Sequence, residues 1–322
     1  AAGVLAAEAH ALSALQHAGY ADCVAGERRV VVDHAAESVA AELRFSVGAH
    51  ARLGALRHEP AGLFRQGFID SIRSWSPGDP YQPDALARLR RDLAATGAVS
   101  RVATQLAPAN ESGIRDVVLE VEAAPRNAYE LGFGYSSTDG FGVEAEWTRR
   151  NFTRRADALS VSTTLGEIRQ DLTLALTRPH AAGLGHTANF GATLQREENE
   201  AFTREGASLF ASVDASTRLR LGRSYGASLS ADRFDNVASG VTDALVLSGF
   251  ADLRNDTTGF SLDPRDGSIF ELRLEPTVST GDATLAFLRT TAEARVFESF
   301  AENDAVTLAA RVGAGWLEPL AG

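Results

Sequence analysis

From about position 126 onward, large apolar residues occupy every second position of this sequence, and no helical period is visible. The first run alternates apolar residues with a glutamate and two glycines: Tyr129, Glu130, Leu131, Gly132, Phe133, Gly134 and Tyr135. Every second side chain of a β-strand lies on one face, so each run predicts a strand with an apolar and a polar face. About eleven such runs follow Arg126, at roughly 18 residues for each strand and its connection.

The length of this repeat separates two kinds of β-structure. A soluble β-sandwich also alternates, because its apolar face packs on a second sheet, but its strands recur about every 8–12 residues. Strands that cross a bilayer at a tilt need about 10 alternating residues each, which fits the longer repeat. Tyr129, Trp147 and Trp316 lie near run ends, as in interface girdles. We predict an antiparallel transmembrane β-barrel over 126–322, with a soluble sandwich as the alternative.

The first half of the chain mixes helical and strand patterns. Residues 48–125 read as strand, helix, helix, strand, strand, which predicts a small α+β module with a mixed sheet. Pro83 and Asp84 fit a helix start there, and Gly97 fits a helix end. Residues 1–47 show leucines at helical spacing followed by two short strands. They are interpreted as the same module without its front end.

Composition excludes several classes of function. The formal net charge is −11 at pH 7 and every basic residue is an arginine, so a nucleic-acid partner is not expected. Cys23 is the only cysteine, which leaves no disulfide and no cysteine cluster for zinc. The sequence contains no metal-binding histidine pair, nucleophile elbow, P-loop or dinucleotide fingerprint. We therefore expect no catalytic residue, no cofactor, no metal site and no enzymatic activity.

Several segments together carry a family resemblance. They are 77–81 (PGDPY), 84–97 (DALARLRRDLAATG), 117–126 (VVLEVEAAPR), 130–137 (ELGFGYSS), Trp147 with Asn151 and Phe152, 262–267 (LDPRDG) and 313–316 (GAGW). This combination resembles the BamA/TamA superfamily of bacterial outer-membrane assembly factors, most closely its TamA branch of translocation and assembly module barrel proteins.

The resemblance implies a specific domain organisation. Residues 1–47 would be part of a POTRA module, 48–125 a complete POTRA module, and 126–322 about eleven strands of a sixteen-stranded barrel. The piece would then be truncated at both ends, with the Arg-Gly-Phe/Tyr loop motif of the family falling beyond Gly322. It would lie in the bacterial outer membrane, with its N-terminal modules in the periplasm.

The mechanism that we predict rests on strand edges, because unpaired backbone groups on an edge attract another strand. The first barrel strand, around 129–135, is predicted to open laterally from the last strand and to pair with a client strand. Gly132 and Gly134 are expected to face a crowded lumen or seam and to weaken that strand. In the POTRA module, β-augmentation at an edge, or a hinge, is assigned to five residues: Val117, Leu119, Val121, Pro125 and Arg126.

The expected partners follow from this mechanism. They are unfolded outer-membrane client proteins, outer-membrane lipid and, by the resemblance to TamA, a TamB-like protein that spans the periplasm. The main rival is a two-partner secretion transporter that exports a β-helical exoprotein through its pore. A passive porin is a second rival, against which the POTRA-like half argues, and a soluble binding module is a third.

Overall fold

The computed structural model describes residues 2–33, 38–137, 140–181, 183–216, 221–236, 240–259, 262–281, 284–300 and 306–321. The chain forms two compact units, Ala1–Ala124 and Pro125–Gly322. In the part of the chain that is described, no helix has both the length and the apolar character needed to cross a membrane.

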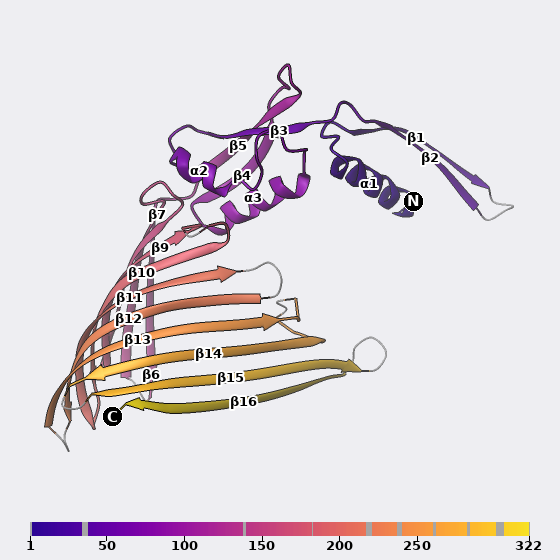
Figure 1. Ribbon diagram of the computed structural model, residues 1–322. Coiled ribbons are helices and arrows are strands. Elements are labelled where there is room, and N and C mark those ends of the chain that lie inside the picture. Colours follow the sequence, from indigo (N-terminus) through magenta and orange to yellow (C-terminus); the bar gives the residue numbers. More distant parts are fainter. Residues whose placement is uncertain are drawn as a thin grey trace. The chain divides into compact units, whose positions relative to one another are not determined.

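The N-terminal unit combines three helices with five strands within the described residues (Figure 1). In chain order the elements are α1 (Ala2–His17), β1 (Val24–Asp33), β2 (Ser38–Ser46), β3 (Arg52–Glu59), α2 (Gln66–Ile72), α3 (Pro83–Ala95), β4 (Val99–Leu106) and β5 (Ile114–Ala123). Strands β1 and β2 form an antiparallel hairpin. The other three form a mixed sheet in the order β3-β5-β4, with β3 parallel and β4 antiparallel to β5.

The helix boundaries have local causes. Helix α3 begins at Pro83, whose fixed φ and missing N–H suit the first turn, and Gly97 follows its end with a φ of 69°. The spacing of Phe68, Ile69, Ile72 and Trp75 predicts a helix from Gln66 to Trp75, but α2 ends at Ile72. Trp75 instead leaves the helix, is buried, and donates its indole N–H to the carbonyl of Gly54 at 2.9 Å.

The core of the mixed sheet lies between its strands and the apolar sides of α2 and α3. Its fully buried members are Leu53, Leu56, Ile69, Leu93, Val117 and Leu119. Strand β5 is hydrogen-bonded on both sides, so it is the centre of the sheet. The prediction that Val117, Leu119 and Val121 lie at an edge is therefore wrong. The edges are β3 and β4, because the parallel pairing of β3 brings it to the far side of β5.

Polar contacts join the α1–β1–β2 segment to the mixed sheet. The guanidinium of Arg115 in β5 donates from Nη1 to both carboxylate oxygens of Asp22, at 2.7 Å each. The backbone N–H of Ala51 donates to the carbonyl of Gly19 at 3.0 Å. His17 Nε2 lies 3.4 Å from a carboxylate oxygen of Asp84. The two parts of this unit are thus held together by specific pairs and not by the chain alone.

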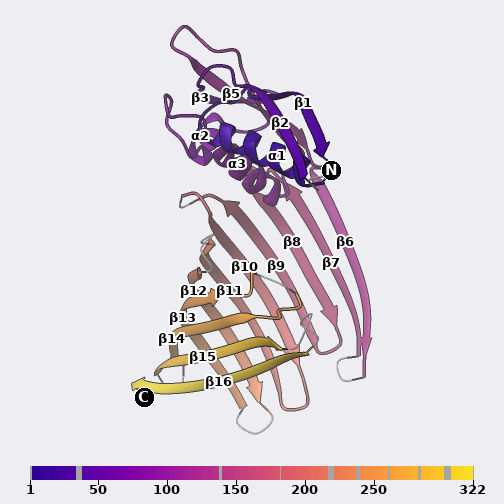
Figure 2. The same cartoon turned by 90° about the vertical axis from the view of Figure 1, so that its right-hand side faces the viewer.

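The second unit is one antiparallel sheet of eleven strands, each paired with its neighbours in chain order (Figures 1 and 2). The strands are β6 (Asn127–Ser136), β7 (Gly140–Arg150), β8 (Ala158–Gly166), β9 (Arg169–Pro179), β10 (His186–Glu198), β11 (Phe202–Ser216), β12 (Leu221–Asn236), β13 (Gly240–Asp256), β14 (Gly267–Thr280), β15 (Leu285–Phe300) and β16 (Val306–Ala321). This agrees with the eleven alternating runs of the sequence.

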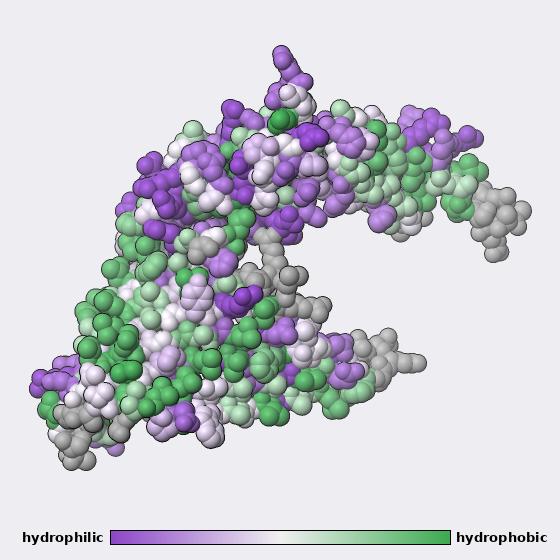
Figure 3. Space-filling view, in the orientation of Figure 1, coloured by the Kyte–Doolittle hydropathy of each residue, from purple (hydrophilic) through white to green (hydrophobic). Residues whose placement is uncertain are grey.

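The sheet has one apolar and one polar face, because directly paired residues share a face. One cross-strand row on the apolar face joins Leu209, Leu229 and Leu247, and all three side chains are exposed. The opposite face carries glycine, serine, threonine and charged residues. Within the described residues no second sheet covers the apolar face, so the soluble sandwich does not fit. Figure 3 shows apolar residues gathered over these strands, whereas the N-terminal unit is mostly hydrophilic on the face shown.

His58 in β3 gives the N-terminal unit a defined pH dependence. Burial lowers the pKa of His58, because a low-dielectric setting disfavours the imidazolium, and its Nε2 accepts a hydrogen bond from the N–H of Phe64 at 3.4 Å. The unfolded chain then binds the proton more readily than the folded one. Its contribution to stability is fully present above pH about 6.5 and is lost as the pH falls through the folded pKa.

We therefore expect the N-terminal unit to lose stability between about pH 7 and pH 5, and His58→Gln to reduce that loss, since glutamine accepts a hydrogen bond without titrating. Urea unfolding followed by the fluorescence of buried Trp75 measures it. His17→Gln is the opposing control. The hydrogen bond to the Ser13 carbonyl raises the pKa of His17, so its contribution is lost as the pH rises. Equal pH profiles for wild type and His58→Gln would contradict the prediction.

Candidate functional site at the free edge of the sheet

Strand β6 forms one edge of the eleven-stranded sheet. Among the described residues it pairs only with β7, in a regular register from Asn127 opposite Arg149 to Ser136 opposite Gly140. In an antiparallel edge strand, alternate residues direct their N–H and C=O groups away from the neighbour. The far side of β6 therefore presents a row of backbone donors and acceptors that another strand can use.

The apolar face of β6 is among the most exposed of the sheet. Its side chains and their exposed fractions are Tyr129 (73%), Leu131 (71%), Phe133 (79%) and Tyr135 (71%). Aromatic pairs mark both ends of this face. Tyr129 is directly opposite Trp147 in β7, and the rings of Tyr135 and Phe141 lie 5.3 Å apart. The indole N–H of Trp147 donates to Asn127 at 3.3 Å, which leaves its ring on the apolar face.

The polar face of β6 has free space beside its glycines, whereas the sequence predicts that neighbouring side chains crowd them. Glu130, Gly132 and Gly134 lie on this face. Each is directly paired with a residue of β7 whose side chain lies on the same face. Among the described residues, a Cβ built on Gly134 would have no atom within 4 Å, and the nearest neighbour of one on Gly132 would be Glu144 at 3.6 Å. The expectation of crowding is therefore wrong for both glycines.

Elsewhere the same face is tightly packed around glycine. The ring of Phe210 in β11 covers Gly191, its direct partner in β10, so closely that no Cβ fits. A Cβ on Gly226 in β12 would lie 2.5 Å from the carbonyl oxygen of Ala211 and 2.7 Å from the ring of Phe250. The inner wall thus changes from interlocked in the middle strands to loose at β6.

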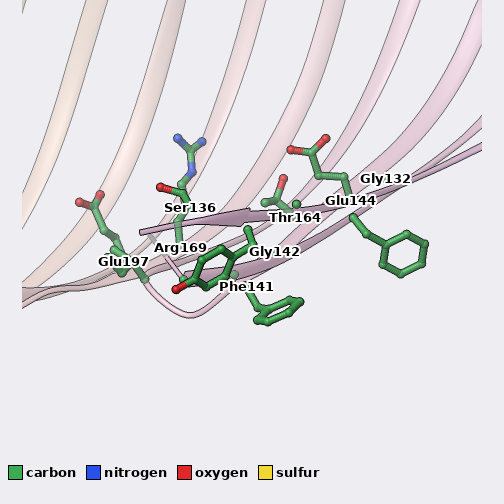
Figure 4. A pocket seen from close by; sticks show the side chains of 14 residues that line it. Gly132, Ser136, Phe141, Gly142, Glu144, Thr164, Arg169 and Glu197 are labelled. Carbon is green, nitrogen blue, oxygen red and sulfur yellow. The ribbon is translucent and has the colours of Figure 1, made fainter. Parts of the chain in front are cut away.

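A hollow of about 630 Å³ lies against the polar face next to β6. Its glycines are Gly132, Gly134, Gly140, Gly142 and Gly166. Figure 4 shows Glu144, Arg169 and Glu197 on one side of the strands and Phe141 on the other. The carboxylate of Glu167 accepts a hydrogen bond from the N–H of Phe141 at 3.0 Å. The described residues contain no cluster of three potential metal ligands.

Pro125 and Arg126 lie at the start of the second unit. Arg150 fixes both of them, because its Nη1 donates to the carbonyl of Pro125 at 3.1 Å and its backbone N–H donates to the carbonyl of Arg126 at 2.8 Å. A hinge at this point would therefore act before Pro125 and not after it. The hinge itself stays a prediction.

Sequence reasoning missed the ion-pair ladder on the polar face of β13 to β16. Arg254 contacts Glu271 at 2.5 Å, and Glu271 lies 3.5 Å from Arg295. Arg295 continues to Glu293 at 2.5 Å, and Glu293 to Arg311 at 2.6 Å. Alternation places these residues on the polar face, but only the register between strands shows which charges meet. The ladder links four strands by ion pairs. It stabilises the part of the wall that is farthest from β6 along the chain.

An antiparallel meander of eleven strands, apolar outside and polar inside, has the construction of a transmembrane β-barrel wall. The Omp85 superfamily domain matches residues 151–322, more than half of the chain, and the chain belongs to this superfamily. Members of it are outer-membrane β-barrel proteins that transport or assemble proteins and are not enzymes. As a member of this superfamily, the chain is part of an outer-membrane β-barrel protein.

Solved structures agree with this fold. The chain is similar to BamA from Haemophilus ducreyi lacking POTRA domains 1–3, with a TM-score of 0.77 and 12% sequence identity, over 99% of this chain and 65% of that one. It is also similar to CdiB from Escherichia coli, with a TM-score of 0.52 and 12% identity, over 98% of this chain and 62% of that one. The chain thus spans less than two thirds of either structure.

The contrast between the two parts of the inner wall is testable. We expect Gly134→Val to leave the barrel foldable, because its side chain enters open space and valine favours a strand. Gly226→Val should destabilise the barrel by about 1–3 kcal/mol or more, since it overpacks against Phe250 and the backbone. Urea unfolding of the refolded full-length protein, followed by heat-modifiable gel mobility, measures both. Equal effects of the two substitutions would contradict the difference in packing.

Proposed function

We propose that this protein is an outer-membrane protein assembly and translocation factor, which inserts client β-barrel or autotransporter proteins. The observation that carries the proposal is the β6 edge, which among the described residues pairs only with β7 and lies in a wall whose outer face is apolar. In hydrocarbon a backbone group without a partner is costly, so an edge that opens there binds another strand strongly. The gate assignment covers residues 129–135, with Gly132 and Gly134 as the positions that weaken pairing.

The apolar band narrows toward β6, which supports a seam at that place. Strands β6 to β9 have 10, 11, 9 and 11 residues, whereas β13 has 17, so the narrowing includes β6 and its three neighbours. Between Tyr129 and Tyr135 the apolar face of β6 extends roughly 20 Å along the strand, because each residue rises about 3.4 Å. With a tilt of about 40° this covers about 15 Å, well short of the apolar band of about 25 Å in outer-membrane barrels. We expect the bilayer to be thinned beside β6 to β9, which would favour insertion at the β6 edge of this region.

The N-terminal unit supports a second part of the proposal, namely that 48–125 is a POTRA module and 1–47 the end of another. The order strand, helix, helix, strand, strand is that expected from the family resemblance, and α1–β1–β2 repeats the order of α3–β4–β5. This region would lie in the periplasm and bind clients or a TamB-like partner by adding a strand to a sheet edge.

Of the two edges of the mixed sheet, β4 is the better candidate for strand addition. The β3 edge is partly occupied, because Leu53 exchanges backbone hydrogen bonds with the 78–79 segment, donating to Asp79 and accepting from Gly78 at 2.8 Å each. Tyr81 adds a third bond to Ala51 at 3.0 Å. Among the described residues β4 pairs only with β5. Strand β4 therefore offers a partner strand a longer row of unpaired backbone N–H and C=O groups than β3 does.

The second candidate is a two-partner secretion transporter that exports one β-helical exoprotein. The observation that favours it is the polar inner face, where ion pairs such as Arg273 to Asp252 at 3.2 Å and Arg289 to Glu275 at 2.6 Å suit a wet passage. The two functions differ in the route of the substrate. An exporter passes it along the inner face, whereas an assembly factor binds it at the β6 edge.

A disulfide between β6 and the strand that closes the barrel in the full-length protein tests the gate. We expect oxidation to abolish insertion of client barrels, because the seam can no longer open. One cysteine would replace Leu131, and Cys23→Ser would remove the natural thiol. Client insertion into vesicles, before and after reduction, is the measurement.

A cross-link inside the wall is the matched control. Glu130 and Glu146 are directly paired between β6 and β7, so a disulfide there constrains the edge strand without closing the seam, and activity should persist. Full activity with the seam cross-linked would sink the gate, and continued export of a single exoprotein in that state would favour the secretion transporter.

Removal of residues 48–125 from the full-length protein tests the role of the N-terminal unit. We expect loss of partner capture with retained membrane insertion, because this segment belongs to a unit that is compact by itself. Co-purification with a TamB-like partner measures capture, and heat-modifiable mobility measures insertion. Unchanged capture would exclude this module as the binding site.

A further inference from the structure

Four arginines gather where β7 and β9 end, on the side of the sheet at which β6 begins. They are Arg149, Arg154, Arg155 and Arg178, and no ion pair joins any of them to another described residue. Arginines at the opposite ends of nearby strands are paired, such as Arg196 with Glu198 at 3.0 Å. In a chain with a net charge of −11, this cluster is a local concentration of positive charge that can bind an anion.

The turn between β7 and β8 presents two of these arginines rigidly. Asp157 is fully buried and accepts hydrogen bonds from the N–H of Thr153 at 2.8 Å and from its hydroxyl at 2.6 Å. The side chain of Asn151 accepts from the N–H of Ala156 at 3.0 Å. Asn151, Arg154 and Ala156 have φ values of 53°, 63° and 56°, a conformation that such residues hold only when their surroundings enforce it.

The cluster lies one step beyond the aromatic end of the apolar face. Trp147 marks that end, and Arg149 is two residues closer to the turn on the same face. The guanidinium of Arg149 lies 5.8 Å from the ring centre of Phe152, an exposed side chain in the turn. Aromatic residues followed outward by cations have the order of a bilayer interface, with the rings at the acyl boundary and the charges at the headgroups.

Arg178 completes the arrangement from β9. The row that contains Arg149 continues through Leu159 to Leu176, so Arg178 is one step beyond that row on the same face. Its Nε is buried and has no hydrogen-bond partner. The Cα atoms of Arg149 and Arg178 are about 12 Å apart from strand spacing and rise alone. Both guanidinium groups can thus reach one multi-oxygen anion placed between them.

We propose that this basic cluster binds the phosphodiester headgroup of an anionic phospholipid in the leaflet at the end of the sheet where β6 begins. A phosphodiester offers oxygens in the fork geometry that guanidinium groups bind bidentately. Its acyl chains continue along the apolar face past Trp147 and Leu159. The bound lipid anchors the barrel wall two strands from the β6 edge, so that the edge can open while its support stays in register with the bilayer.

The proposal rests on the membrane insertion stated above, and one experiment separates the two. The full-length protein is inserted into phosphatidylcholine vesicles with a minor share of either brominated phosphatidylglycerol or brominated phosphatidylcholine. Trp147 fluorescence, taken as the difference from a Trp147→Phe protein, reports the lipid beside the cluster. We expect brominated phosphatidylglycerol to quench severalfold more strongly. Each arginine near the surface should account for up to about fivefold of this preference.

Paired variants test the residues. Arg149→Gln/Arg178→Gln should bring the two lipids to nearly equal quenching, and Arg149→Lys/Arg178→Lys should retain part of the preference, because charge stays and the fork is lost. Arg196→Gln/Arg233→Gln removes the same charge from the other end of the apolar face and should leave the preference intact. Equal quenching in the wild type, or a preference that persists in the glutamine pair, would overturn the lipid site. A protein that fails to insert at all would instead contradict the proposed function.

Discussion

The absence of water inside a bilayer is the constraint on which the second unit depends. Each backbone N–H and C=O there must find a partner in the protein, and a β-sheet provides one only between strands. The sheet meets this demand by pairing every strand from β7 to β15 on both sides. Within the described residues two edges remain, β6 and β16. The alternation of apolar and polar side chains comes second to this backbone pairing. It only makes one face of the sheet suited to lipid and the other suited to water.

The side-chain contacts that join neighbouring strands on the inner face differ from one edge of the sheet to the other. In the middle strands, aromatic rings lie over glycines, as Phe210 over Gly191 and Phe250 against Gly226. Farther along, the ladder from Arg254 to Arg311 links four strands by ion pairs. Next to β6 neither device is present among the described residues. A Cβ built on Gly134 or Gly142 would have no described neighbour within 4 Å, whereas Gly140 lies against the carboxylate of Glu167. Loss of pairing at β6 therefore disturbs little of the remaining wall.

Periodicity predicts most of the second unit, because the faces of a strand are a local property of sequence. It predicts the number of strands after Arg126 and the apolar side of each, and Pro83 predicts the start of α3. It does not predict which strand of the mixed sheet is central, since the parallel pairing of β3 with β5 joins residues far apart in sequence. Periodicity also does not show which side chains of neighbouring strands meet. It therefore predicts crowding at Gly134 wrongly, and it does not show which arginines have no carboxylate as an ion-pair partner.

Both proposed binding edges, β4 in the N-terminal unit and β6 in the barrel wall, offer an incoming chain the same interaction. A client strand that leaves one edge for the other exchanges one row of backbone hydrogen bonds for a similar row, so the exchange itself needs little free energy. The drive comes from the client, whose apolar face is buried in lipid only once its own barrel closes. Such a device needs no nucleotide. It needs a seam weaker than the client's own pairing, and this is the role that we propose for β6 and its glycines.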